Sequence, residues 1–232
     1  MSYLAAVRHP WPCLVFLVPL LAGYEIGVAR LDGTTAEPVR AGVDLWVRHW
    51  LAENGVTGMA VAPGALLLLL AFWSFWQWKE RPERVFTAVF GIVLEGVLFG
   101  LGLWALCANA PAIFSRLGLP LAALGTNAEA KAVMFIGVGI YEEVVFRLVL
   151  FAGLARIIHF VLVPKIVAVP MALIASSAVF ALAHHWVQTD PFLPAVFLTR
   201  LMIGAYCALL YWWRGLGVAV GAHIVYDLVV GL

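Results

Sequence analysis

Residues 140–150 have the sequence IYEEVVFRLVL, which places Glu142, Glu143 and Arg147 inside a long apolar run. A charged side chain at the centre of a bilayer costs at least about 2.5–3.5 kcal/mol on insertion scales. A chain that keeps three such residues in one apolar segment needs a partner, a hydrated cavity or a chemical task for each of them. The sequence around this stretch therefore decides both the fold class and the candidate site.

The composition of the chain is that of an integral membrane protein. Of the 232 residues, 64% are hydrophobic and 12% are charged, whereas a soluble domain has about 45–50% apolar and about 25% charged residues. The formal net charge of +1 argues against a nucleic-acid partner. Three cysteines lie in separate apolar segments without a CxxC pair, so neither a disulfide framework nor a zinc knuckle is expected.

Apolar runs long enough to cross a bilayer recur along the chain. They predict an all-α fold, a polytopic helical membrane bundle of about seven transmembrane helices. The expected spans are residues 11–29, 57–78, 85–108, 131–158, 164–187, 192–213 and 216–231.

The sequence between the first two spans predicts an interfacial amphipathic helix. Its core, residues 39–52, reads VRAGVDLWVRHWLA and carries Arg40, Asp44 and Arg48 on one face. Another face carries Val43, Val47 and Trp50.

The whole chain, residues 1–232, is expected to form a single integral-membrane domain. Residues 130–232 carry the polar motifs, and residues 1–129 supply accessory helices. The compact charged turn at residues 79–84, KERPER, favours a cytoplasmic N-terminus under the positive-inside rule. This orientation places the following basic residues on the cytoplasmic side: Arg8, Lys79, Arg81, Arg84, Arg156, Lys165 and Arg214.

Helical geometry separates the charges of the opening stretch. Glu143 and Arg147 are four residues apart with the acid first, which predicts an ion pair along one helix. Such a buried pair is also typical of a purely structural role. Glu142 points about 100° away from Glu143 and is left for another task.

Two later spans carry imidazoles and a further carboxylate. His184 and His185 lie near the end of the fifth span, and His223 and Asp227 share one face of the seventh. If these faces converge with Glu142, they form a hydrated pocket of groups that act as general bases or metal ligands. A lone intramembrane histidine is often only hydrogen-bonded to a neighbour. Polar and charged groups that are costly to place in a bilayer, on three different helices, favour a functional site.

The remaining intramembrane charges have simpler interpretations. Glu95 in the third span and Arg200 in the sixth are expected to pair with each other across helices. Glu25, near the end of the first span, is expected at the membrane interface.

Three motifs resemble, in order and spacing, those of the CPBP family, which includes CAAX prenyl protease 2 and the bacteriocin-processing, or Abi, intramembrane proteases. They are EExxxR at residues 142–147, FxxxH at residues 180–184 and HxxxD at residues 223–227. The resemblance covers about residues 130–232. It implies an intramembrane endopeptidase that cuts a peptide bond in or near the membrane, with a membrane-associated protein or peptide and the lipid bilayer as its partners.

The resemblance also implies catalytic roles. Glu142 would be the general base that activates water, with assistance from His184. His223 and Asp227 would stabilise the oxyanion or hold the water. The supporting residues would be Glu143 and Arg147, which organise the site, and His185, which faces away from His184 and would act from behind it.

The chain departs from the prenyl proteases at Asp227, where those proteins have Asn. An Asn amide donates a hydrogen bond to an oxyanion, whereas an ionised Asp repels it. Asp227 would therefore act in protonated form, orient His223, or bind a metal together with Glu142, His184 and His223. The family mechanism is either glutamate-based or metal-dependent, so the expected cofactor is none or one divalent metal such as zinc. An inactive family member is a further alternative.

The substrate stays open among prenylated proteins, leader peptides and C-terminal sorting tails. Two other functions are alternatives: a proton-coupled transporter, which also uses intramembrane Glu and His residues, and a non-catalytic membrane scaffold or immunity factor. The protease interpretation explains the order of the motifs as well as the residue types. The expected location is the bacterial inner membrane, as a multi-pass protein.

Overall fold

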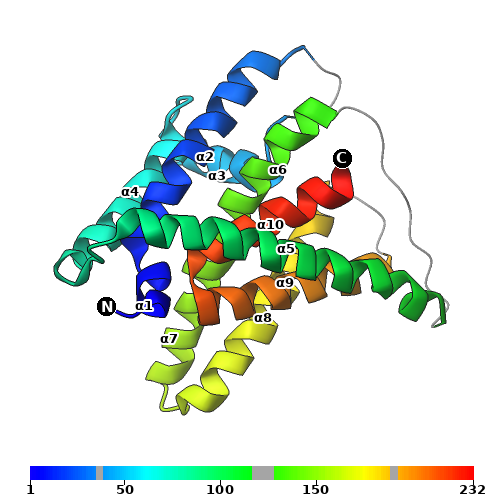
Figure 1. Cartoon of the computed structure of the whole chain (residues 1–232). Coiled ribbons are helices and arrows are strands. Elements are labelled where there is room, and N and C mark those ends of the chain that lie inside the picture. The colour runs from blue at the N-terminus through cyan, green and yellow to red at the C-terminus, as the bar shows by residue number, and fades with distance from the viewer. Residues whose placement is uncertain (35–38, 117–127, 189–192) are drawn as a thin grey trace.

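The computed structural model describes residues 1–34, 39–116, 128–188 and 193–232, without the side chains of residues 110–116 and 185–188 (Figure 1). The elements in this part of the chain are all helical, which confirms the predicted all-α membrane bundle. The helices are α1 (Tyr3–Arg8), α2 (Pro10–Leu31), α3 (Gly42–Glu53), α4 (Val61–Trp76), η1 (Trp78–Glu80), α5 (Val85–Arg116), α6 (Ala128–Glu143), η2 (Val144–Phe151), α7 (Ala152–Phe160), α8 (Lys165–Gln188), α9 (Pro194–Arg214) and α10 (Leu216–Gly231).

Among the described residues, four helical segments are long and apolar enough to cross a membrane. They are Pro10–Leu31, Val85–Asn109, Lys165–His184 and Pro194–Arg214. The predicted spans at residues 57–78 and 216–231 fall on the shorter apolar helices α4 and α10. The predicted span at residues 131–158 is divided into α6, η2 and α7.

This division comes from a π-helical segment, η2, that begins directly after Glu143. A π-helix has hydrogen bonds from residue i to i+5, is rare, and often occurs at functional sites. Its sequence, VVFRLVLF, is apolar on nearly every side, so the helical period cannot be read from it. The sequence therefore predicted the existence of this helix but not its change of period.

α10 lies near the middle of the bundle, against α5, α6 and α9 (Figure 1). Its contact with α5 is close because glycines face each other: a Cβ on Gly96 would lie 3.0 Å from the Cα of Gly221. α6 is packed between α2 and α10. Helices from the N-terminal half of the chain thus hold both helices on which the first and third motifs lie.

The amphipathic segment forms α3, but its charged face points into the protein. Asp44 is fully buried and pairs with Arg40 at 2.9 Å and with Arg48 at 2.7 Å. Both arginines also contact Glu25 of α2, at 3.4 and 2.9 Å, and Tyr24 donates a hydrogen bond to Asp44 at 2.8 Å. The outward face carries exposed apolar side chains instead: Leu45, Trp46 and Trp50.

The expected pair between Glu95 and Arg200 is not formed. Glu95 accepts a hydrogen bond from Nε of Arg214 at 2.6 Å, makes a second contact with the same guanidinium, and accepts a hydrogen bond from Tyr3 at 2.6 Å. The prediction was wrong because spacing within each helix does not fix how far two helices are shifted along each other. Glu95 therefore joins α5 to the end of α9 and to α1.

Candidate active site

The two adjacent glutamates are both buried, although consecutive helical residues point about 100° apart. They occupy the last two positions of α6, where α2 and α10 pack around the helix and η2 begins. Because the helix is packed on both sides, Glu142 and Glu143 contact different partners within one site.

Glu143 joins two other elements. Its Oε1 accepts a hydrogen bond from the Nδ1–H of His223 on α10 at 2.8 Å. Its Oε2 lies 3.1 Å from Nε of Arg147, without the alignment of a hydrogen bond. The predicted ion pair along the helix is therefore confirmed.

Arg147 is 1% exposed and has contacts beyond this pair. Its Nη2 donates to the carbonyl of Gly204 on α9 at 3.3 Å. Its guanidinium carbon lies 4.5 Å from the centroid of the Phe180 ring, a cation–π contact. A Cβ at position 204 would lie only 3.0 Å from that ring, so the glycine allows α9 to come close.

Phe180 is the aromatic centre of the site, a role that sequence reasoning did not assign to it. Its ring centroid lies 4.8 Å from that of His184 and 6.1 Å from that of His223. Its ring also meets Phe146 edge-on, with 5.3 Å between the centroids. The phenylalanine of FxxxH therefore contacts a residue of each of the three motifs. The signal for this role in the sequence was the position of Phe180 one helical turn before His184.

His184 is held by the backbone of its own helix. Its Nδ1 lies 2.9 Å from the carbonyl oxygen of Phe180, which only accepts, so Nδ1 carries the proton. In the neutral ring, Nε2 then presents a lone pair, and it lies 3.5 Å from Oε1 of Glu142. Two acceptors thus face each other across a short gap.

His223 lies among three carboxylates. Besides the bond from Nδ1 to Glu143, its Nε2 lies 3.6 Å from Oδ2 of Asp227 and 4.0 Å from Oε2 of Glu142. Among the described residues, no group makes a hydrogen bond with that Oε2, although it is buried. The free oxygen marks the place where a water or a substrate group can bind.

The structure thus brings together the four residues that the sequence singled out for chemistry: Glu142, His184, His223 and Asp227. Asp227 contacts His223 on its own helix, one turn away, which is the arrangement of a residue that orients an imidazole. The side chain of His185 lies outside the described residues.

The cluster contains carboxylates and imidazoles, the ligand types that bind divalent cations. Three carboxylates face one guanidinium and two imidazoles, so with neutral imidazoles the formal charge of the cluster is −3 + 1 = −2. Each histidine is oriented through Nδ1 by a carbonyl or a carboxylate, which is usual for metal-binding histidines. The residues that would hold a cation are Glu142, His184, His223 and Asp227.

A tighter cluster lies directly behind this set. In the described part of the chain, the group with all ligand atoms within 4.8 Å of one another is Glu143, Cys207 and His223. The hydrogen bond between Glu143 and His223 accounts for the closeness of those two residues, and all three residues are buried. Cys207 was predicted only as a buried apolar cysteine, and no spacing in the sequence linked it to the motifs.

A large apolar groove borders the site. Its volume is about 1020 Å³, and it lies between α3 on one side and η2, α7 and α8 on the other. Phe146, which contacts Phe180, and Ala183, which precedes His184, belong to its wall. Its other lining residues are nearly all apolar, so an apolar segment can lie within reach of the buried polar groups.

Comparison with protein families identifies the segment that contains all three motifs. Residues 128–229 match the model of the type II CAAX prenyl endopeptidase Rce1-like family. No curated protein and no solved structure matches the chain.

Proposed function

We propose that the chain, whose residues 128–229 match the Rce1-like family of type II CAAX prenyl endopeptidases, is a CAAX-type intramembrane protease that hydrolyses a peptide bond with water activated by Glu142 and His184. The observation that carries the proposal is the 3.5 Å gap between Oε1 of Glu142 and Nε2 of His184. Because Nδ1 of His184 donates to the carbonyl of Phe180, both facing atoms are acceptors. A water that donates one hydrogen to each would satisfy both and be aligned for attack.

In this mechanism Glu142 takes a proton from the water while the water oxygen forms a bond to the scissile carbonyl carbon. Glu142 then gives that proton to the amide nitrogen, and the C–N bond breaks to leave a carboxylic acid and an amine; the acid then passes its proton to the amine, which gives a carboxylate and an ammonium group. No protein residue is covalently modified, so each turnover consumes one water molecule.

His223 is the proposed partner of the tetrahedral oxyanion. When both ring nitrogens are protonated, Nδ1–H donates to Glu143 and Nε2–H is free to donate to the oxyanion. Asp227, 3.6 Å from Nε2, orients the ring and balances its charge. A divalent cation bound by the same residues would supply a Lewis acid for the scissile carbonyl.

The groove supports the proposed class of substrate. A protein with an apolar membrane segment or a lipid chain beside the scissile bond can place that part in the groove while the bond meets Glu142. Prenylated proteins, leader peptides and C-terminal sorting tails all satisfy this requirement. A bacterial inner membrane is the proposed location.

The test compares the termini of membrane proteins in cells that express the wild type or Glu142→Gln. The matched control is Glu129→Gln, which removes an exposed carboxylate from the start of the same helix. New protein termini should be present with the wild type and the control and absent with Glu142→Gln. Identical termini in all three strains would refute the proposal.

A further inference from the structure

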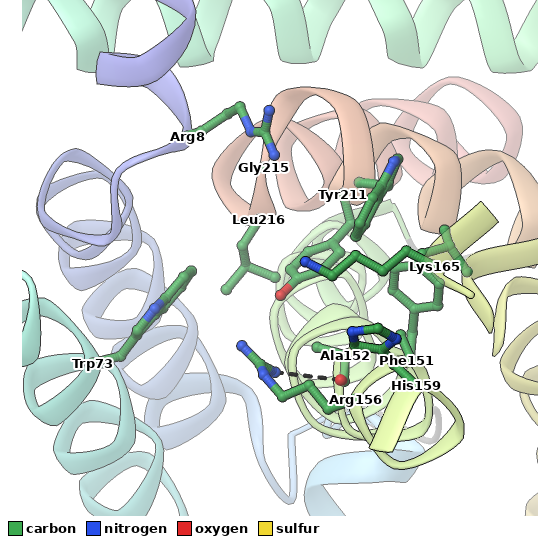
Figure 2. Close-up of a pocket in the computed structure, with 13 residues that line it drawn as sticks. Arg8, Trp73, Phe151, Ala152, Arg156, His159, Lys165, Tyr211, Gly215 and Leu216 are labelled. Atoms are coloured by element: carbon green, nitrogen blue, oxygen red, sulfur yellow. Dashed lines mark hydrogen bonds between the residues drawn. The ribbon is translucent and has the colours of Figure 1, made fainter. Parts of the chain in front are cut away.

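A second pocket, of about 290 Å³, lies at the other end of η2, where Phe151 and Ala152 form part of its wall (Figure 2). Phe151 follows Glu142 by nine residues, so the pocket is on the order of 10 Å from the candidate active site along the helix. Residues of α1, α4, α7, α8, α9 and α10 complete the wall. The pocket is therefore separate from the catalytic groups but built on helices adjoining them.

Three cationic side chains, those of Arg8, Arg156 and Lys165, line this pocket. Figure 2 shows the nitrogen ends of Arg156 and Lys165 nearer the hydroxyl of Tyr211, whereas the guanidinium of Arg8 lies apart from them, beside Gly215. One of them, Arg156, also donates to the carbonyl of Ala152 at 3.3 Å. The residues that line the pocket, all from the described part of the chain, include no acid.

Among the residues that the structure describes, Arg8, Arg156 and Lys165 have no counterion, because the ion pairs there are formed by other arginines or by histidines. Like charges that share one pocket repel each other, and a bound anion would remove that repulsion. The pocket is therefore suited to an anion with several acceptor oxygens, such as a phosphate group.

Gly215 forms the back of the pocket and keeps Arg8 in place. Its φ is +94°, a conformation that L side chains rarely adopt, and a Cβ there would lie 3.0 Å from the Cα of Arg8. The turn between α9 and α10 thus packs directly on the end of α1. The three cations lie on three separate helices, α1, α7 and α8.

The position of the pocket relative to the bilayer points to a lipid. The turn from α7 to α8 carries Phe160, Val161 and Leu162, which are 86%, 62% and 94% exposed. Such a turn is suited to insertion among acyl chains. Trp73 and Trp212 line the pocket itself, as expected at the level of lipid headgroups. All three cations belong to the side that the sequence places in the cytoplasm, where membranes present anionic lipids.

We propose that this pocket binds the phosphate group of an anionic phospholipid. Arg156 and Lys165 contact the phosphate oxygens, Arg8 adds positive charge from the wall at Gly215, and the acyl chains run into the bilayer beside the apolar turn. The volume of about 290 Å³ accommodates a headgroup but not the chains. The bound lipid ties α7 and α8 to α1 and so stabilises the arrangement of helices around η2.

The test measures lipid binding to the full-length protein by native mass spectrometry in detergent micelles, with phosphatidylglycerol or phosphatidylcholine as the added lipid. The wild type should bind phosphatidylglycerol more tightly. Each removed cation should weaken that binding roughly five-fold, so the double variant Arg156→Gln/Lys165→Gln should lose about 25-fold. A control double variant, Lys79→Gln/Arg84→Gln, removes two exposed cations outside the pocket and should bind as the wild type does.

Two results would overturn the proposal: equal binding of the two lipids by the wild type, or equal weakening in the pocket and control variants. Inorganic phosphate distinguishes the source of the group. If phosphate alone binds as tightly as phosphatidylglycerol, the ligand is a free anion and the lipid assignment is wrong. Arg8→Gln, at an exposed position on α1, gives an independent single-site measurement if the double variant does not fold.

Discussion

Removing the buried cation Arg147 should destabilise the protein more than any surface change. Arg147 and Glu143 are 1% and 0% exposed at the side chain and lie 3.1 Å apart. At an effective dielectric constant of about 20, two unit charges at 3.1 Å attract each other by about 5 kcal/mol. Arg147→Met keeps most of the volume but leaves the Glu143 carboxylate buried, and we expect a loss of about 3–5 kcal/mol in the free energy of unfolding.

The matching change Glu143→Gln should also cost about 3–5 kcal/mol, because it leaves the guanidinium buried with the Gly204 carbonyl and the Phe180 ring as its remaining partners. The double variant Arg147→Met/Glu143→Gln buries no uncompensated charge from this pair. Its loss should therefore fall short of the sum of the single losses by about 2–3 kcal/mol.

The assay is equilibrium unfolding of the purified protein in mixed micelles, with sodium dodecyl sulfate as the denaturant and circular dichroism as the signal. A double-mutant cycle from the four proteins gives the coupling energy. Additive losses, with a coupling energy near zero, would refute the argument that these two charges stabilise each other in the interior.

Three other changes test particular contacts. Phe180→Leu removes the cation–π contact and the edge-on pair with Phe146, so it should lower the free energy of unfolding by about 2–3 kcal/mol; a loss below that range in the same unfolding assay would contradict it. If Asp227 only orients His223, Asp227→Asn should keep activity in the metal-free protein. If Asp227 is a metal ligand, Asp227→Asn should lower both the activity and the metal content, which elemental analysis measures. Burial lowers the pKa of His9, whose Nδ1 accepts from the amide of Trp11. The unfolded chain then binds a proton at a higher pH than the folded chain, so His9 should destabilise the protein as the pH falls below about 6.5. A His9→Asn variant should show a smaller decrease in melting temperature between neutral and mildly acidic pH, and an unchanged decrease would exclude this role.

The sequence predicted those features that depend on residue type and on spacing within one helix. The all-α membrane bundle followed from apolar runs, and the pair of Glu143 and Arg147 followed from the spacing of four residues. The convergence of Glu142, His184 and His223 was expected because charged groups are costly in a bilayer.

Other details of how the helices are placed against each other could not be predicted. Glu95 pairs with Arg214 rather than with Arg200. This could not be predicted because hydropathy does not show how far one helix is shifted along another. The π-helical segment begins within a run of apolar residues that has no polar stripe to reveal its period. The role of Phe180 appears only when both histidines and Arg147 are seen around its ring.

The central claim is that Glu142 activates the water that hydrolyses the peptide bond, and single-turnover cleavage by purified Glu142→Gln tests it most directly. The substrate is the protein whose new terminus distinguishes the wild type from Glu142→Gln in cells, and Glu129→Gln serves as the control. Loss of a general base should lower the rate by about 100-fold to 10,000-fold while the control cleaves at the wild-type rate. Cleavage by Glu142→Gln at the rate of the control would contradict the claim.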